Sequence, residues 1–466
     1  MTQDLAGRRR QPVAADRVAV NGDVWGVLAV VATALALFAP LLATGRVWID
    51  GDLGDFYWPT MQAVFGALRD GQSPLWNPNL MGGFPLFADG SVGALFPLNW
   101  VLLVMPHGLM LIPFLRTLVA GLGMYAFVRV VGVGPVGAAV AGLVFALNSF
   151  SVSHFSHIDL NNGTALLPWL LLAVEKSLRA PSWRRQALWL LAAGVSYGLV
   201  WLSLHPMAPL MMLPVYAGWV LYRALTYSGP RPTTDDEGPK TNGTSASPLV
   251  RSRWLWALAA LTLPVVIALG LAAAQVVPMA ELGSLSPRQA AGARFNASFS
   301  LPPYDLIGLV WPTFFQSAPG GPRWGLWNLE TLTYLGALPF VLALLAVVAW
   351  PRRRHVGFFV VTALLALWVA FAVYAPLSPQ PWLYSLPGYN VLRAPARFFY
   401  VVGFAGAYLA AVGIDWLVAR QWDKAPVRRV CWLLMGLAAL AVSIPLVGAA
   451  IVLFVNGVPG QAERAI

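Results

Sequence analysis

Long apolar runs separated by short polar segments cover most of the chain. A helix that crosses a bilayer needs about 20 mostly apolar residues. Eleven segments are candidates, and they lie near residues 24–44, 108–130, 133–150, 163–178, 184–203, 208–226, 254–275, 331–350, 356–376, 398–419 and 430–454. The pattern predicts an all-α integral membrane protein with about eleven transmembrane helices, of which 133–150 and 163–178 are short enough to be re-entrant instead.

Composition supports a bilayer environment. Of the 466 residues, 58% are hydrophobic and 11% are charged, whereas soluble domains carry about 25% charged residues. The net charge of +11 does not indicate a nucleic-acid partner, because the basic residues are dispersed beside apolar runs rather than gathered on one face. The single cysteine, Cys431, lies in an apolar run, which excludes an intramolecular disulfide and a cysteine-based metal site.

Basic residues concentrate in alternate polar segments, and this alternation predicts the topology. The segments are 8–17, 129, 176–185, 223–253, 352–354 and 420–429. Since cytoplasmic loops carry an excess of Lys and Arg, we expect a cytoplasmic N-terminus. The first apolar segment is expected to remain as a span, because roughly twenty mainly polar residues precede it, which a cleaved signal peptide does not have.

The predicted organisation has four parts. They are a cytoplasmic tail (1–23), an N-terminal transmembrane module (24–226), a cytoplasmic linker (227–253) and a C-terminal transmembrane module (254–466). The linker is rich in Pro, Gly, Ser and Thr, which predicts disorder.

Two long loops, 45–107 and 276–330, face outward in this topology and are where we expect function. Their aromatic and proline-rich sequences are typical of short amphipathic helices that lie on the membrane interface. Within 59–70, four apolar residues share one face at helical spacing, namely Met61, Val64, Phe65 and Leu68.

Three carboxylates, Asp50, Asp52 and Asp55, open the first outer loop. Like charges this close raise one another's pKa, so one of them can serve in acid–base catalysis. A pair, Asp50 with Asp52, can instead hold a divalent cation such as Mg²⁺ or Mn²⁺. The simpler interpretation is a solvated acidic turn, since Gly51 and Gly54 favour turns.

Other polar residues stand at or inside span ends. Arg116 lies within an apolar stretch, where an arginine faces a cavity or an acidic partner unless it snorkels to the surface, and we expect a lipid-phosphate or acidic-partner role. Arg288 and Arg294, in the second outer loop, are weaker candidates for binding substrate. Glu330 precedes an apolar span and can pair with an arginine or act in catalysis.

His154, His157, Asp159 and His205 also fall at outer span ends. The spacing of the first two histidines argues against zinc, because zinc-binding helices more often place two histidines four residues apart with a glutamate between them. Hydrogen bonding to an acceptor substrate and packing at the interface remain the two interpretations.

Several specific sequence blocks resemble one family. They are Pro74-Leu75-Trp76-Asn77-Pro78, the stretch 152–168, Leu204-His205-Pro206, Tyr334-Leu335-Gly336 and Arg393-Ala394-Pro395-Ala396-Arg397-Phe398. Over about residues 24–420 the chain is similar to the YfhO family of bacterial multi-pass membrane proteins. Relatives usually carry more spans, so we expect a short form or a fragment.

The resemblance implies a GT-C-type glycosyltransferase of the bacterial plasma membrane with an extracytoplasmic active site. Its donor would be a polyprenyl-phosphate sugar, and its acceptor a glycolipid or an envelope polymer such as a teichoic acid. The catalytic carboxylate of the first outer loop maps onto Asp52, with Asp55 or Asp50 as neighbours, and the sequence does not decide among the three.

The leaving phosphate of such a donor needs fixed cationic groups. Arg393 and Arg397, four residues apart in one block, are the first choice, although arginines at span ends often only snorkel to the interface. Two other classes stay open, a flippase of lipid-linked sugars and a non-catalytic scaffold of a glycosylation complex. The oligomeric state is not predicted.

Overall fold

A computed structural model describes residues 12–47, 51–80, 82–203, 205–227, 253–286, 292–309, 311–312, 329–348, 355–386 and 388–421. The sequence predictions that fall outside these residues include the carboxylate Asp50, Arg288, Cys431, the basic segment 352–354, nearly all of the linker, and the span at 430–454.

Helices joined by turns make up the described chain, apart from one isolated antiparallel bridge between Asn77 and Phe84. The predicted all-α class is therefore confirmed for these residues. The long helices are α1 (Pro12–Thr44), α5 (Leu111–Val130), α6 (Pro135–Leu147), α9 (Leu167–Leu178), α10 (Trp183–Leu202), α11 (Met207–Thr226), α13 (Arg253–Ser284), α15 (Ala337–Val348), α16 (Val356–Phe371) and α18 (Phe399–Gln421).

Six helical segments of the described chain are long and apolar enough to cross a membrane. They are Asn21–Thr44, Leu111–Val130, Pro135–Ser153, Arg253–Ser284, Val356–Tyr374 and Pro395–Val418. The predicted count of about eleven is not confirmed. At 1.5 Å per residue the 12-residue helices α9 and α15 measure about 18 Å, against a hydrocarbon core of about 30 Å.

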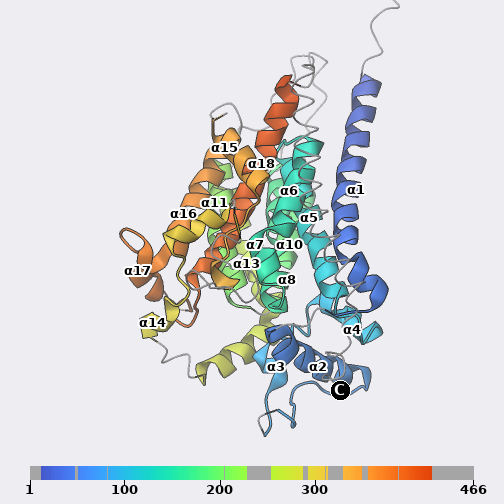
Figure 1. The fold of residues 1–466 in the computed structure, drawn as a ribbon, viewed down its shortest axis with the longest axis vertical. Helices are drawn as coiled ribbons and strands as arrows, with labels where there is room; N and C mark the ends of the chain where they lie inside the picture. The colour runs from blue at the N-terminus through green and yellow to red at the C-terminus, as the bar shows by residue number, and fades with distance from the viewer. Residues whose placement is uncertain are drawn as a thin grey trace, which may run out of the picture.

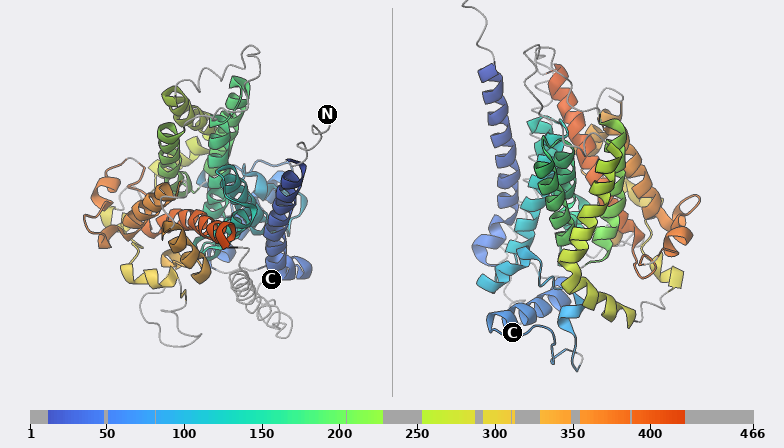
Figure 2. Two further views of the ribbon diagram at one scale, coloured as in Figure 1. Left: turned by 90° about the horizontal axis from the view of Figure 1, so that it is seen from above. Right: turned by 180° about the vertical axis from the view of Figure 1, so that it is seen from behind.

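The long helices run side by side along the longest axis of the molecule (Figure 1). Helix α18 packs against α6, α15 and α16, and α10 packs along α13. Helix α1 lies at the edge and contacts α5 and α6, as both Figure 1 and the view from above in Figure 2 show. Aromatic rings fill the centre, for example Phe359 stacked on Tyr408 at 3.9 Å between ring centroids.

Apolar side chains are also exposed on the outer helices, including Leu258 and Val266 of α13 and Leu364 of α16. Helices of a soluble protein turn such residues inward, whereas hydrocarbon solvates them. Together with the six apolar helical segments, this surface indicates a membrane-embedded protein.

The loop 45–107 folds into a small layer at one end of the bundle, the lower end in Figure 1, which we call the loop end. It contains η1 (Leu53–Tyr57), α2 (Trp58–Arg69), α3 (Leu86–Asp89) and α4 (Val101–Val104). The amphipathic prediction for 59–70 is confirmed for Met61, Val64 and Phe65, which are fully buried. It is wrong for Leu68, which lies in the last turn of α2 and is exposed.

Candidate functional site

A break between two helices supplies much of the candidate site. Asn148 has an extended backbone that ends α6, and its side chain accepts a hydrogen bond from the backbone N–H of Ser151, which caps α7 (Ser149–Ser153). The chain then turns through 154–157 into α8 (Ile158–Thr164). The short helices place several polar residues of one sequence stretch at the loop end, where a continuous helix would distribute them around its axis.

A buried ion pair joins the two halves of the chain. Arg397 lies in η7 (Pro395–Phe398), just before α18, and Glu330 lies in η5 (Leu329–Thr331). Arg397 Nε donates to Glu330 Oε2 at 2.8 Å and Nη2 donates to Oε1 at 2.5 Å. Both side chains are more than nine-tenths buried, at 4% and 9% exposure.

Two histidines complete the contacts of this pair. His154 lies with Nε2 2.9 Å from Glu330 Oε2, and Arg397 Nη1 lies 2.9 Å from His205 Nε2. Burial alone would raise the pKa of Glu330, but hydrogen bonds from His154 and Arg397 together outweigh it and hold that pKa well below its usual range. Glu330 is therefore ionised at neutral pH and fixes the positions of its partners.

Asp52 marks the exposed rim of the same cluster. Its Oδ2 lies 3.3 Å from Nε2 of His157, slightly beyond an ordinary hydrogen bond, and its side chain is 64% exposed. Burial, with help from the nearby His154 and Arg397 charges, lowers the pKa of His157 to about 4. His157 is therefore neutral at physiological pH, and its Nδ1 is buried with no hydrogen-bond partner among the described residues.

Tyr57 and Asp159 lie behind this rim. Tyr57 Oη donates to Asp159 Oδ1 at 2.7 Å, and the backbone N–H of Leu160 donates to the same oxygen at 2.6 Å. Burial raises the pKa of Asp159 to about 6. Burial, followed by the charge of Asp159, raises the pKa of Tyr57 well above its usual value.

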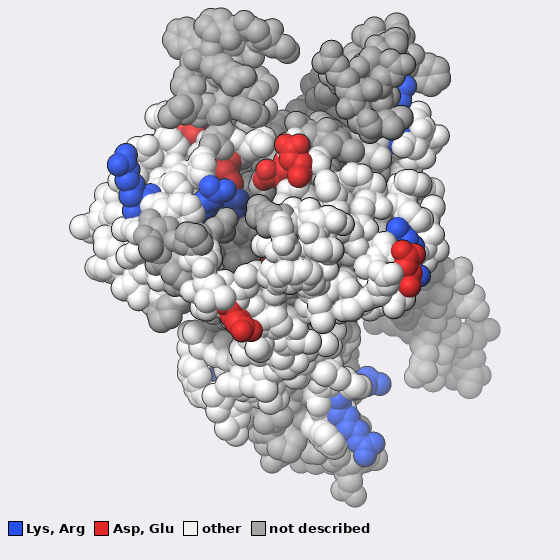
Figure 3. All heavy atoms as spheres, turned by 90° about the horizontal axis from the view of Figure 1, so that it is seen from below, with Lys and Arg blue, Asp and Glu red and all other residues white. Residues whose placement is uncertain are grey.

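We call these eight residues the carboxylate–histidine cluster: Asp52, Tyr57, His154, His157, Asp159, His205, Glu330 and Arg397. Figure 3 views the molecule from the loop end and shows acidic and basic side chains around a hollow near the middle of that face. The arrangement combines one exposed carboxylate with a buried network that holds its neighbours in place, which is what general acid–base chemistry requires.

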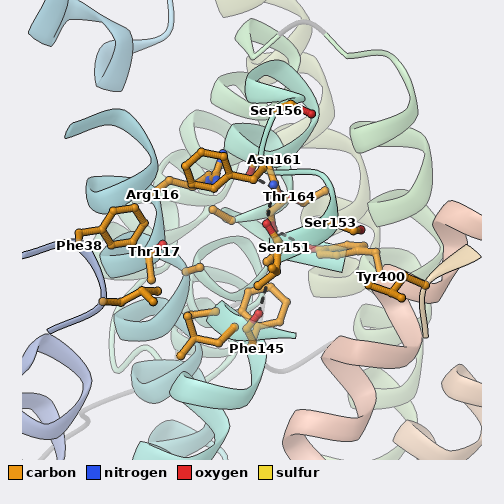
Figure 4. Close-up of a pocket in the computed structure, with 18 of the residues that line it drawn as sticks. Phe38, Arg116, Thr117, Phe145, Ser151, Ser153, Ser156, Asn161, Thr164 and Tyr400 are labelled. Carbon is orange, nitrogen blue, oxygen red and sulfur yellow. Dashed lines mark hydrogen bonds between the residues drawn. The ribbon is translucent and has the colours of Figure 1, made fainter. Parts of the chain in front are cut away.

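An apolar cavity of about 360 Å³ is lined in part by residues of the same 148–165 segment. Phe155 lines it, between the two cluster histidines His154 and His157 in sequence, and Leu329 lines it next to Glu330. Figure 4 shows Arg116 extending from α5 on one wall and Tyr400 of α18 on the opposite side. The cluster and the cavity thus share neighbouring residues of the same segments.

The structure brings seven sequence-predicted residues together: Asp52, His154, His157, Asp159, His205, Glu330 and Arg397. Asp55 is exposed on η1, and Arg294 is exposed on α14 (Gly292–Asn296). Arg393 lies over the rings of Phe295 and Phe299, at 5.9 and 5.4 Å from their centroids. Phosphate contact by Arg393, and binding roles for Asp55 and Arg294, stay predictions.

Within the described residues, no group of three or more His, Cys, Asp or Glu side chains is arranged to hold a metal ion. The predicted cation pair includes Asp50, which is outside those residues, so divalent-cation binding stays a prediction.

Sequence reasoning missed Tyr57, which directly follows the acidic block, and gave Asp159 no role beyond its neighbours. The sequence does hold a signal for Asp159, because 148–164 is unusually polar for a segment between two apolar runs. Asn161 and Asn162 of that stretch are buried, and Asn162 Nδ2 donates to Asn99 Oδ1 at 3.0 Å. Tyr400 carries no such signal, since it is one of many aromatic residues in apolar runs.

Comparison with models of protein families, with curated proteins and with solved structures finds no match to this chain.

Proposed function

We propose that the protein is a GT-C-type membrane glycosyltransferase that moves a sugar from a polyprenyl-phosphate donor to an envelope polymer or glycolipid. The reaction would take place at the extracytoplasmic face of a bacterial plasma membrane, with the loop end on that side. The observation that carries the proposal is the setting of Asp52, an exposed carboxylate in contact with a partly exposed, neutral imidazole at the end of a membrane-embedded bundle. A carboxylate at that end of the bundle can meet a sugar presented by a lipid.

The proposed step is a single displacement. The Asp52 carboxylate takes the proton of an acceptor hydroxyl, whose oxygen bonds to the anomeric carbon as the bond from that carbon to the phosphate oxygen breaks. The polyprenyl phosphate leaves with the electron pair. His157 acts as a positioning residue, because its contact with Oδ2 limits the orientations of the carboxylate.

Stabilisation of the leaving phosphate is assigned to arginine. Arg397 already donates to both oxygens of Glu330 and to His205, so a phosphate contact would require one of these bonds to be exchanged. Arg393 is free of such ion pairs among the described contacts and lies over two phenylalanine rings.

The test is release of polyprenyl phosphate by the purified full chain in lipid, supplied with a panel of polyprenyl-phosphate sugars and envelope acceptors. Release should require acceptor and should fall about 100-fold or more in Asp52→Asn. Asp70→Asn is the matched control, because Asp70 is an exposed carboxylate of the same loop. Unchanged release in Asp52→Asn would remove the base assignment.

The rival classes give different results in the same assay. A flippase would carry the sugar lipid across liposome bilayers without release of polyprenyl phosphate. A scaffold would show neither activity and would tolerate loss of every acidic residue in 45–107.

A further inference from the structure

Arg116 is the one charged residue among the described residues that line the cavity. It is 5% exposed, its guanidinium lies 5.7 Å from the centre of the Phe155 ring, and its Nη1 has no hydrogen-bond partner in the described chain. A buried charge without an acidic partner is costly and is normally compensated by an opposite charge, which a ring face replaces only in part. The compensating group is therefore expected from a ligand.

Among the described residues of the wall, Arg116 Nη1 is the one buried side-chain nitrogen or oxygen without a hydrogen-bond partner. Thr117 donates to the carbonyl oxygen of Pro113 at 2.8 Å. Asn161 Nδ2 donates to the carbonyl oxygens of Ser151 and His154 at 2.9 and 2.8 Å. The unsatisfied hydrogen-bonding capacity of the cavity is thus concentrated at Arg116, which favours a ligand with one strongly anionic group.

The remaining wall is apolar. Leu37, Phe38 and Leu41 come from α1, and Phe145 and Leu147 come from α6. A wall of this kind suits a hydrocarbon chain, and about 360 Å³ is within the usual range of ligand sites, enough for a headgroup and the adjoining part of a chain. Arg116 is five residues into α5, so it lies about 8 Å from the start of that helix.

We propose that this cavity binds a membrane amphiphile with a phosphate headgroup, with Arg116 as the counter-charge and the apolar wall around the first part of the chain. Two sources share this chemistry, the polyprenyl-phosphate lipid and an acidic phospholipid of the bilayer. Assignment to the polyprenyl phosphate rests on the proposed function, because the cavity shares the 148–165 segment with the carboxylate–histidine cluster. The binding itself does not depend on it.

The experiment measures binding to the full chain in detergent, by native mass spectrometry, of decaprenyl phosphate, dioleoyl phosphatidic acid and the neutral decaprenol. Arg116→Gln should weaken binding of the phosphate lipid about tenfold or more. Arg116→Lys should retain most of it. Arg184→Gln is the matched control, because Arg184 is exposed and lies over the ring of Trp183 outside the cavity.

Dependence on Arg116 for decaprenyl phosphate alone supports the site and identifies the polyprenyl lipid as its ligand. The same dependence for phosphatidic acid supports the site with an acidic phospholipid as ligand. Equal binding of both phosphate lipids to wild type and Arg116→Gln, or equal binding of decaprenol and its phosphate with no Arg116-dependent binding of phosphatidic acid, overturns the proposal.

A second readout protects against misfolding of the variant. Ligand-free Arg116→Gln should unfold at a higher temperature than wild type, since it removes an unpaired buried charge, whereas a purely structural role predicts a lower temperature. Arg116-dependent binding in a protein that transfers no sugar would reject the proposed function and keep the site. Sugar transfer without Arg116-dependent binding would reject the lipid site and keep the proposed function.

Discussion

Two buried glutamate–arginine pairs lie near opposite ends of α11. At the loop end, Glu330 pairs with Arg397, which contacts His205 just before the helix. In the last turn, Arg223 holds Glu175 of α9 through two bonds of 2.9 Å. From 205 to 223 the chain advances about 27 Å at 1.5 Å per residue.

The surroundings of the two pairs differ. Glu175 is fully buried and receives a second arginine, Arg179, at 2.6 Å, while the rings of Trp219 and Tyr227 lie against the guanidinium of Arg223. These contacts hold α9 and α11 together. Glu330 instead shares its oxygens with His154 and lies in a cluster that reaches an exposed carboxylate. A buried ion pair is therefore not evidence of a site, and the neighbouring titratable groups and the access from outside distinguish the two.

The largest expected effect is common to both pairs. Glu175→Gln and Glu330→Gln should each lower the free energy of unfolding by about 3–5 kcal/mol, because each leaves a buried arginine without its counter-charge. Thermal and denaturant unfolding in detergent measures this. A loss below about 1 kcal/mol for either variant would show that the pair is solvated or replaced, and the structural half of the comparison would not hold.

A smaller effect, confined to the loop end, is expected for His157→Gln. Loss of the contact that orients Asp52 should slow transfer about tenfold, while the free energy of unfolding changes little. The measurement is kcat for sugar transfer, with the exposed His107→Gln as control. A decrease in His157→Gln no greater than in the control would exclude the positioning role.

Lowering the pH should change the stability of the protein through groups at the loop end that act in opposite directions. The folded-state pKa of His157 is about 4 and that of His205 is also lowered, so both bind protons mainly when unfolded and stability falls as the pH drops below about 6.5. Asp159, with its pKa raised to about 6, binds its proton first in the folded state, which offsets part of that loss between about pH 6 and 4.

Asp159→Asn should therefore make the decrease in unfolding temperature from pH 6.5 to 4 steeper. The measurement is a pH series of thermal unfolding for wild type and variant. Parallel curves would show that Asp159 does not titrate in this range.

The smallest effect is expected at Arg179, the partly exposed arginine beside the pair of Glu175 and Arg223. Arg179→Gln should cost at most about 1 kcal/mol, because the Arg179 side chain is 40% exposed and Glu175 keeps both bonds to Arg223. Denaturant unfolding beside Arg223→Gln tests this ranking. Equal losses would mean that the two arginines are equivalent partners.

The local sequence pattern was sufficient to predict the long helices, but it did not predict where they break or what their side chains contact. Apolar runs predicted nearly every long helix, since the bilayer requires hydrophobic segments of a set length. The break at Asn148 inside the expected span 133–150 was not predicted, because that segment reads as continuously apolar until its last residues. The exposure of Leu68 likewise depends on what covers the end of α2 rather than on helical spacing.

For the candidate site, the sequence predicted the members but not the contacts. His154, His205 and Glu330 were candidates because each stands at a span end. That Glu330 would pair with Arg397, 67 residues away, depends on how η5 and η7 meet. From the sequence, Arg223 is only one of the basic residues that indicate topology. Its pairing with Glu175, 48 residues away, cannot be predicted from the local sequence either.

The most direct test of the contrast between the two pairs is the initial rate of polyprenyl-phosphate release per folded molecule, measured in parallel for Glu330→Gln and Glu175→Gln at a temperature where both are folded. The account predicts a loss of about tenfold or more in Glu330→Gln and a rate close to wild type in Glu175→Gln. Equal rates in the two variants would contradict it.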